Sequence, residues 1–142
     1  MADPRLRAKV LWDGVLATTT LIRGFEVRTD KPKGLWGTNT APAPGELFIG
    51  GLGAAVLTTY AQRLRLRKLD VGDLALDVTA PLTVVADDER IESILFKLKV
   101  WLPPGVDAAT YEQLAEGLLA AVPLLQAISP PTELAVEIRP AT

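Results

Sequence analysis

The chain of 142 residues contains no cysteine and no histidine. Without cysteine it has no thiol nucleophile, no disulfide and no thiolate ligand for zinc. Without histidine it lacks the side chain that most often acts as a general base near neutral pH and as a metal ligand. The two serines, Ser93 and Ser129, therefore have no histidine partner for a catalytic triad. These absences exclude several common enzyme mechanisms before any motif is considered.

The composition is typical of a folded domain and gives no electrostatic reason to expect nucleic-acid binding. Hydrophobic residues make up 49% of the chain, charged residues make up 23%, and the net charge is −2. The first residues are charged and no long apolar run follows them. We therefore expect one domain over residues 1–142, in the cytoplasm, without a membrane span, a nucleic-acid partner, a metal or another cofactor.

The first thirty residues predict a three-stranded meander. Apolar and basic residues alternate over residues 5–12, β-branched residues dominate residues 15–21, and residues 25–29 alternate again. Asp13 and Gly14 predict the first hairpin turn between these segments. The loop that follows, over residues 31–44, carries Trp36 near its middle and is long enough to suggest a functional or interfacial role.

A long helix is predicted from Glu46 to about Lys68. Its first half is crowded with small residues, and each of Gly50, Gly51 and Gly53 costs about 1 kcal/mol of helix stability relative to alanine. These glycines therefore indicate that another element packs close to the helix backbone. The helix ends in a basic set of residues, for which we expect a solvated helix end rather than a phosphate site: Arg63, Arg65, Arg67 and Lys68.

The second half predicts a hairpin, a second helix and a last strand. Residues 74–78 and 95–102 alternate as strands, and Asp107 is a good N-cap for a helix whose apolar spacing continues to Val122. Residues 134–138 alternate as the last strand. The order indicates an α+β fold with a mainly antiparallel sheet, in which a β-meander, a long central helix, a hairpin, a second helix and a last strand follow one another.

The segment from Gly37-Thr38-Asn39 to Ala54-Ala55, which includes Pro44-Gly45-Glu46-Leu47-Phe48-Ile49-Gly50-Gly51-Leu52-Gly53, resembles the OsmC/Ohr family. This family comprises osmotically induced protein C and the organic hydroperoxide resistance proteins. The order of predicted elements agrees with the family along nearly the whole chain. Val122-Pro123 also lies at the family's spacing before the last strand. The resemblance implies an OsmC-like fold and an intertwined homodimer, and the meander by itself cannot cover its own apolar face.

The resemblance places the family's peroxidatic cysteine at Ala55 and its resolving cysteine at Val122. Family chemistry uses a thiolate, held by an arginine and a glutamate, to attack a hydroperoxide, after which the second thiol closes a disulfide. Neither sulfur is present here. The family glutamate falls on Gly45, next to Glu46, and no motif selects the arginine among Arg23, Arg28 and the loop lysines Lys31 and Lys33.

Two interpretations of the candidate site stay open. Ala55 and Val122 either line a small apolar pocket for a hydrophobic ligand, or the core fills the space. Glu46 either faces a ligand or stabilises the first turn of its helix, and Trp36 either covers a pocket or contacts a partner.

We expect a stress-response-type protein that is not a thiol peroxidase, acting as a dimeric binding or structural protein. The alternative is an enzyme with non-thiol or hydroperoxide-related chemistry near Ala55 and Glu46. A wet, polar pocket beside Ala55 would favour the enzyme, and a dry, filled one would favour the structural role.

Overall fold

The computed structural model describes residues 4–85 and 88–141, without the side chains of Val84, Val85 and Asp88. The chain divides into two units, residues 1–48 and 49–142, and the boundary falls within the long helix. Within the described residues, no helix is both long and apolar enough to cross a bilayer. The expectation that residues 1–142 form one domain remains a prediction.

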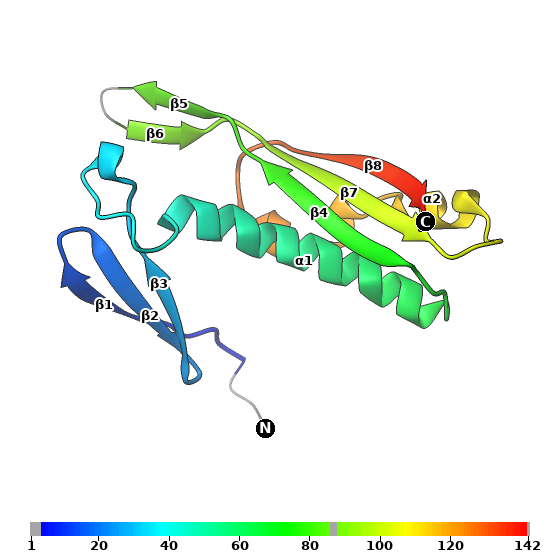
Figure 1. Ribbon diagram of the computed structural model, residues 1–142, viewed down its shortest axis with the longest axis horizontal. Helices are drawn as coiled ribbons and strands as arrows, with labels where there is room; N and C mark the ends of the chain where they lie inside the picture. Colours follow the sequence, from blue (N-terminus) through cyan, green and yellow to red (C-terminus); the bar gives the residue numbers. More distant parts are fainter. Residues whose placement is uncertain (1–3, 86–87, 142) are drawn as a thin grey trace. The chain divides into compact units, whose positions relative to one another are not determined.

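The first unit is built on an antiparallel meander of three strands, β1 (Lys9–Gly14), β2 (Ala17–Ile22) and β3 (Phe25–Thr29) (Figure 1). The predicted turn at Asp13-Gly14 is wrong by two residues, because Gly14 pairs with Ala17 and the turn lies at Val15-Leu16. Gly14 has φ 103°, which favours glycine, and the strand is bulged there. The indole N–H of Trp12 donates to the carbonyl of Val15 at 3.1 Å and holds the tip.

The second unit combines the long helix with a mixed sheet. Helix α1 (Pro44–Leu66) is followed by β4 (Asp73–Thr79), the hairpin β5 (Leu82–Val85) and β6 (Asp88–Ile91), and then β7 (Ile94–Leu102). Helix α2 (Ala108–Ala115) and the 3₁₀ turns η2 (Leu119–Ala121) and η3 (Pro123–Ala127) lead to β8 (Thr132–Pro140). The sheet order is β4-β7-β8, antiparallel between β4 and β7 and parallel between β7 and β8. The predicted α+β class with mainly antiparallel pairing is confirmed.

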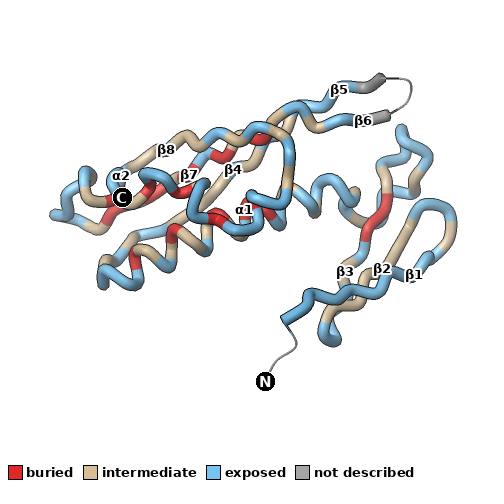
Figure 2. Tube along the Cα trace, turned by 180° about the vertical axis from the view of Figure 1, so that it is seen from behind, coloured by how far each residue is buried: buried red, intermediate tan, exposed pale blue. Residues whose placement is uncertain are grey.

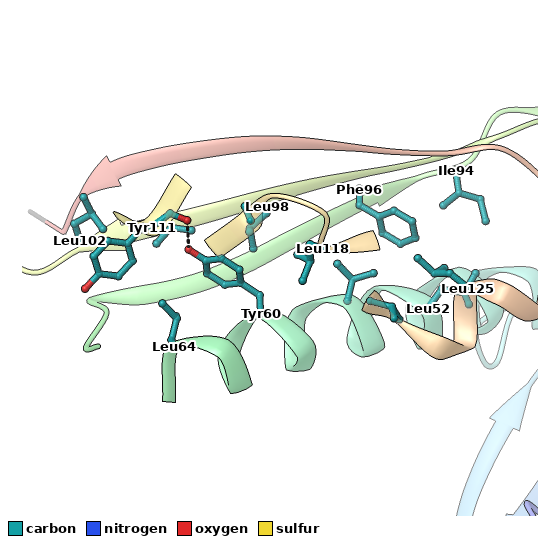
Figure 3. Packing of buried hydrophobic residues seen from close by; sticks show 14 residues of the cluster. Leu52, Tyr60, Leu64, Ile94, Phe96, Leu98, Leu102, Tyr111, Leu118 and Leu125 are labelled. Carbon is teal, nitrogen blue, oxygen red and sulfur yellow. Dashed lines mark hydrogen bonds between the residues drawn. The ribbon is translucent and has the colours of Figure 1, made fainter. Parts of the chain in front are cut away.

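Strand β7 lies at the centre of this sheet and supplies its core face. Every second residue is buried, as the alternation predicted, and Figure 2 shows buried and more exposed positions alternating along it. Helix α1 packs Leu52, Val56, Tyr60 and Leu64 at four-residue spacing against that face. The packed side chains lie between α1, the sheet and the segment that follows α2 (Figure 3).

Only Gly53 of the three predicted close-packing glycines meets a neighbour. An ideal Cβ there would lie 2.5 Å from Val78 Cγ2 on β4, whereas a Cβ on Gly50 or Gly51 would meet nothing within 4 Å. Gly53→Ala is therefore expected to lower the free energy of unfolding by about 1–2 kcal/mol, because overpacking exceeds the gain in helix propensity. Gly51→Ala, the matched control, is expected to be neutral or stabilising by up to about 1 kcal/mol. Urea unfolding measures both, and equal stabilisation by the two changes would contradict the packing.

Tyr60 is the buried polar anchor between the two helices. Its hydroxyl donates to the carbonyl of Tyr111 at 2.9 Å, and the hydroxyl of Tyr111 donates to the carbonyl of Asp70 at 2.6 Å. Figure 3 draws the first of these bonds across the core. Burial, with a smaller contribution from nearby Tyr111, raises the pKa of Tyr60 to about 12.

Because the folded-state pKa of Tyr60 lies above the ordinary value of 10.0, the folded state disfavours its phenolate. Stability from this group is complete below about pH 10 and is expected to fall as the pH rises toward 12. Ultraviolet absorbance of the phenolate, followed together with circular dichroism, measures both events. In Tyr60→Phe the high-pH titration step should disappear, while loss of the hydroxyl's hydrogen bond to the Tyr111 carbonyl costs about 1 kcal/mol at neutral pH. A Tyr60 that ionises near pH 10 in the folded protein would refute this assignment.

Candidate functional site

Ala55 and Val122 both belong to the packed interior of the second unit. Ala55 lies in α1, is partly exposed and packs against the buried cluster. Val122 is 1% exposed and lies between η2 and η3, where its extended backbone joins the two turns. Pro123 follows as the first residue of η3. The surroundings of Val122 are thus those of a core residue, and the side chains of this cluster are almost all aliphatic or aromatic.

The depressions formed by described residues of the second unit include four that lie away from Ala55 and Val122. These four have volumes between about 340 and 410 Å³, and neither Ala55 nor Val122 lines any of them. One of them runs along the segment after α2 and along β8, past Leu119, Leu134 and Val136. These four depressions therefore give no direct opening to the two family positions.

The end of α2 is held by Arg63, which the sequence analysis predicted to belong to a solvated helix end. Arg63 Nη1 of α1 donates to the carbonyl of Leu114 at 2.7 Å and to that of Glu116 at 3.0 Å. Helix α2 ends at Ala115, and Gly117 follows with φ 63°. The prediction that this helix continues to Val122 is therefore wrong. The guanidinium satisfies carbonyls that a longer helix would have used internally, and this sets the path of the chain toward Val122.

Glu46 lies in the first turn of α1 and is exposed. Its Oε1 accepts a hydrogen bond from the backbone N–H of Ala43 at 2.8 Å. The carboxylate therefore pairs an N–H at the positive end of the helix, as a capping residue does. A ligand-facing role for Glu46 remains a prediction.

Trp36 closes the short 3₁₀ helix η1 (Lys33–Leu35) in the loop of the first unit. It adopts φ 71° and is 86% exposed. Gly37, next to it, is required by space, because a Cβ there would lie 2.0 Å from the carbonyl oxygen of Lys31. The indole is thus displayed at the tip of a tight turn and is not buried in the first unit.

Asp30 is a buried, multiply hydrogen-bonded carboxylate that the sequence analysis did not predict. Its side chain is completely buried and accepts hydrogen bonds from Lys31 N at 2.7 Å, Thr40 N at 3.0 Å, Thr40 Oγ1 at 2.7 Å, Thr38 N at 3.3 Å and the Thr38 hydroxyl. The hydroxyl of Thr38, with both donors of Thr40 and the Lys31 N–H, holds the pKa of Asp30 well below its usual range despite burial. The tripeptide Asp30-Lys31-Pro32 indicates a turn, but nothing in the sequence shows that five hydrogen-bond donors converge on the Asp30 carboxylate.

The guanidinium of Arg23 lies 5.4 Å from the centre of the Phe25 ring, a cation–π contact at the tip between β2 and β3. Within residues 4–85 and 88–141, no group of three acidic side chains is placed to hold a metal ion.

The sequence model of the OsmC-like protein family matches residues 37–137. A comparison with curated protein sequences gives no match. Among solved structures, the fold is similar to an OsmC-like protein from Mycoplasma pneumoniae, with a TM-score of 0.79, 16% identity and coverage of 97% of this chain and 99% of that one.

Two further structures support the same fold. An OsmC-like protein of unknown function from Vibrio cholerae has a TM-score of 0.80 at 9% identity, covering 94% of this chain and 99% of that one. An organic hydroperoxide resistance protein from Legionella pneumophila has a TM-score of 0.70 at 16% identity, covering 98% and 99%. At such identities these likenesses show the fold alone.

Proposed function

The chain belongs to the OsmC-like protein family and has no cysteine. We propose that it is a cytoplasmic member of the family that does not reduce peroxides through thiols and that acts as a dimeric binding or structural protein. The observation that carries the proposal is the pair Ala55 and Val122. The resemblance assigns the two thiols to these positions, and each holds a side chain that can neither attack a peroxide nor form a disulfide.

The surroundings of the two positions favour binding or structure over catalysis. Val122 is buried among apolar side chains, and Ala55 packs against the same cluster. The side chains around the two positions are apolar, so a ligand held here would be small and apolar. Glu46 is already engaged with Ala43 at the start of α1, which supports a role in helix capping. A non-thiol enzyme is therefore the weaker reading.

The exposed face of the meander supports the dimer. Val10, Trp12 and Phe25 share one face of β1-β2-β3, since paired residues of a sheet lie on the same side, and they are 62%, 75% and 61% exposed. Figure 2 shows β1 exposed along its length. These side chains present on the order of 300 Å² of apolar surface, at about 150–250 Å² per aromatic residue. The largest apolar patch on a monomer is commonly of this size and is often functional, and a second copy is the partner that the family resemblance implies.

Purified protein is expected to consume an organic hydroperoxide no faster than a heat-denatured sample when a dithiol reductant is supplied. The physical reason is that neither the attacking nor the resolving sulfur exists. Peroxide loss is followed colorimetrically, with a cysteine-containing hydroperoxide resistance protein as the positive control. Turnover that saturates with hydroperoxide and vanishes on denaturation would overturn the proposal.

Native mass spectrometry of freshly purified protein tests the other half of the proposal. The expected result is a dimer, with or without a bound small apolar molecule that is lost on denaturation. A stable monomer at micromolar concentration would contradict the dimeric role.

A further inference from the structure

The loop after β3 is closed at several levels. The backbone N–H of Asp30 donates to the carbonyl of Pro42 at 2.9 Å, that of Asn39 to Lys31 at 2.9 Å, and that of Gly37 to Pro32 at 3.1 Å. Inside this closure the buried carboxylate of Asp30 collects donors from Lys31, Thr38 and Thr40. A loop closed by this many hydrogen bonds loses little conformational entropy when it binds a partner.

Such rigidity has no evident purpose within the first unit itself. The loop does not bury Trp36, which is 86% exposed at φ 71°, or Leu35, which is 44% exposed. Holding a non-glycine residue such as Trp36 at positive φ costs free energy, and the hydrogen bonds that close the loop offset that cost. Tryptophan, with tyrosine and arginine, is enriched among the residues that contribute most binding energy at protein interfaces.

We propose that Asp30 is a positioning residue that holds Trp36 as a preformed anchor for a second copy of this chain, where the indole packs on the apolar face formed by Val10, Trp12 and Phe25. This inference rests on the proposed dimer. Each copy carries both the protruding indole and the open sheet face, so a two-fold pair satisfies both at once, as symmetric interfaces require.

The exposed area agrees with this occupant. Together with Trp36 and Leu35, the sheet face offers on the order of 500 Å² of apolar surface. A standard interface buries about 800 Å² per partner, of which roughly 56–65% is non-polar. The first unit alone therefore carries about the apolar surface that one side of a stable dimer needs, which favours a second copy over a small or weakly held partner.

The test measures the dimer dissociation constant of the full chain by sedimentation velocity. Trp36→Ala is expected to raise it at least about 30-fold, since an anchor is removed on both sides of the two-fold axis. Asp30→Asn, which replaces an acceptor oxygen by a donor, is expected to raise the dissociation constant about tenfold. Thr40→Val removes only one hydroxyl and is expected to raise it by a smaller factor. Lys33→Ala, an exposed change in the same loop, is the matched control and should leave the constant unchanged.

A double-variant cycle separates positioning from general stability. If Asp30 acts through Trp36, Asp30→Asn should add little to the dissociation constant once Trp36 is alanine, because the anchor it positions is gone. Thr40→Val covers the case in which Asp30→Asn fails to fold. Coupling between Trp36→Ala and Phe25→Ala tests the receiving face in the same way.

The outcomes distinguish the two proposals. A wild-type chain that is monomeric overturns the dimer on which both rest. A dimeric wild type whose dissociation constant is unmoved by Trp36→Ala, or in which Asp30→Asn weakens association equally with and without Trp36, overturns only the anchor. Additive effects of Trp36→Ala and Phe25→Ala would show that the indole packs elsewhere.

Discussion

The double variant Ala55→Cys/Val122→Cys is expected to close an intramolecular disulfide almost completely under mild oxidation by glutathione disulfide. The resemblance assigns these positions to a pair of thiols that meet. Val122 belongs to the buried cluster of the second unit, and Ala55 packs against that cluster. The two thiols would lose their hydrogens to the oxidant, which is reduced to two glutathione thiols. A bridge closing so long a segment should raise the free energy of unfolding by about 4 kcal/mol. Intact mass after alkylation of free thiols measures closure, and urea unfolding measures the stabilisation.

The matched control for this variant is Ala54→Cys/Val122→Cys. Ala54 is the neighbour of Ala55 on α1 but is exposed, so its side chain points away from the cluster. A disulfide needs Cα atoms about 4.4–6.8 Å apart with suitably directed side chains, so the control should remain a dithiol. Equal closure in both variants, or none in the first, would refute the assignment of Ala55 and Val122. Non-reducing electrophoresis separates bridges within one chain from bridges between two.

Phe96→Ala is expected to lower the free energy of unfolding of the second unit by about 4 kcal/mol. The ring is completely buried on β7, between α1 and the sheet, and its removal leaves a cavity that the surrounding side chains fill only in part. Urea denaturation followed by far-ultraviolet circular dichroism measures the loss.

Lys97→Ala is the control for the same strand. The side chain of Lys97 faces the other side of the sheet, is 46% exposed and lies 3.8 Å from Glu137. Surface ion pairs of this kind contribute at most about 1 kcal/mol, so the control should change stability little. If both substitutions cost the same, the division of β7 into a core face and an outer face would be wrong.

The parts of the fold that depend on local periodicity could be predicted from the sequence. The alternation along β7 places Phe96, Leu98, Val100 and Leu102 on one face of the strand, and all four are buried. Asp107 was predicted as a helix N-cap, and its carboxylate accepts from the N–H of Ala109 at 3.0 Å. In both cases the signal lies within a few residues of the feature it specifies.

Features that depend on distant residues could not be predicted. Apolar spacing suggested that α2 reached Val122, but Gly117 and the guanidinium of Arg63, about fifty positions earlier in the chain, end it at Ala115. The glycines of α1 had identical local signals, and only the position of Val78 on β4 decides that Gly53 is tightly packed and Gly51 is not. The turn at Val15-Leu16 depends on pairing of Gly14 with Ala17 and not on the Asp-Gly dipeptide.

The candidate site shows the same division. The sequence by itself determined that no thiol chemistry can occur, since no fold can supply an atom that the chain does not contain. Through the resemblance, it also assigned the family's two cysteine positions to Ala55 and Val122. Only the tertiary structure decided that Val122 is a core residue, that Arg63 supports the end of α2, and that Asp30 is buried at the centre of a closed loop. Burial and convergence of donors are properties of the folded chain, because they depend on which residues far apart in sequence come to lie together.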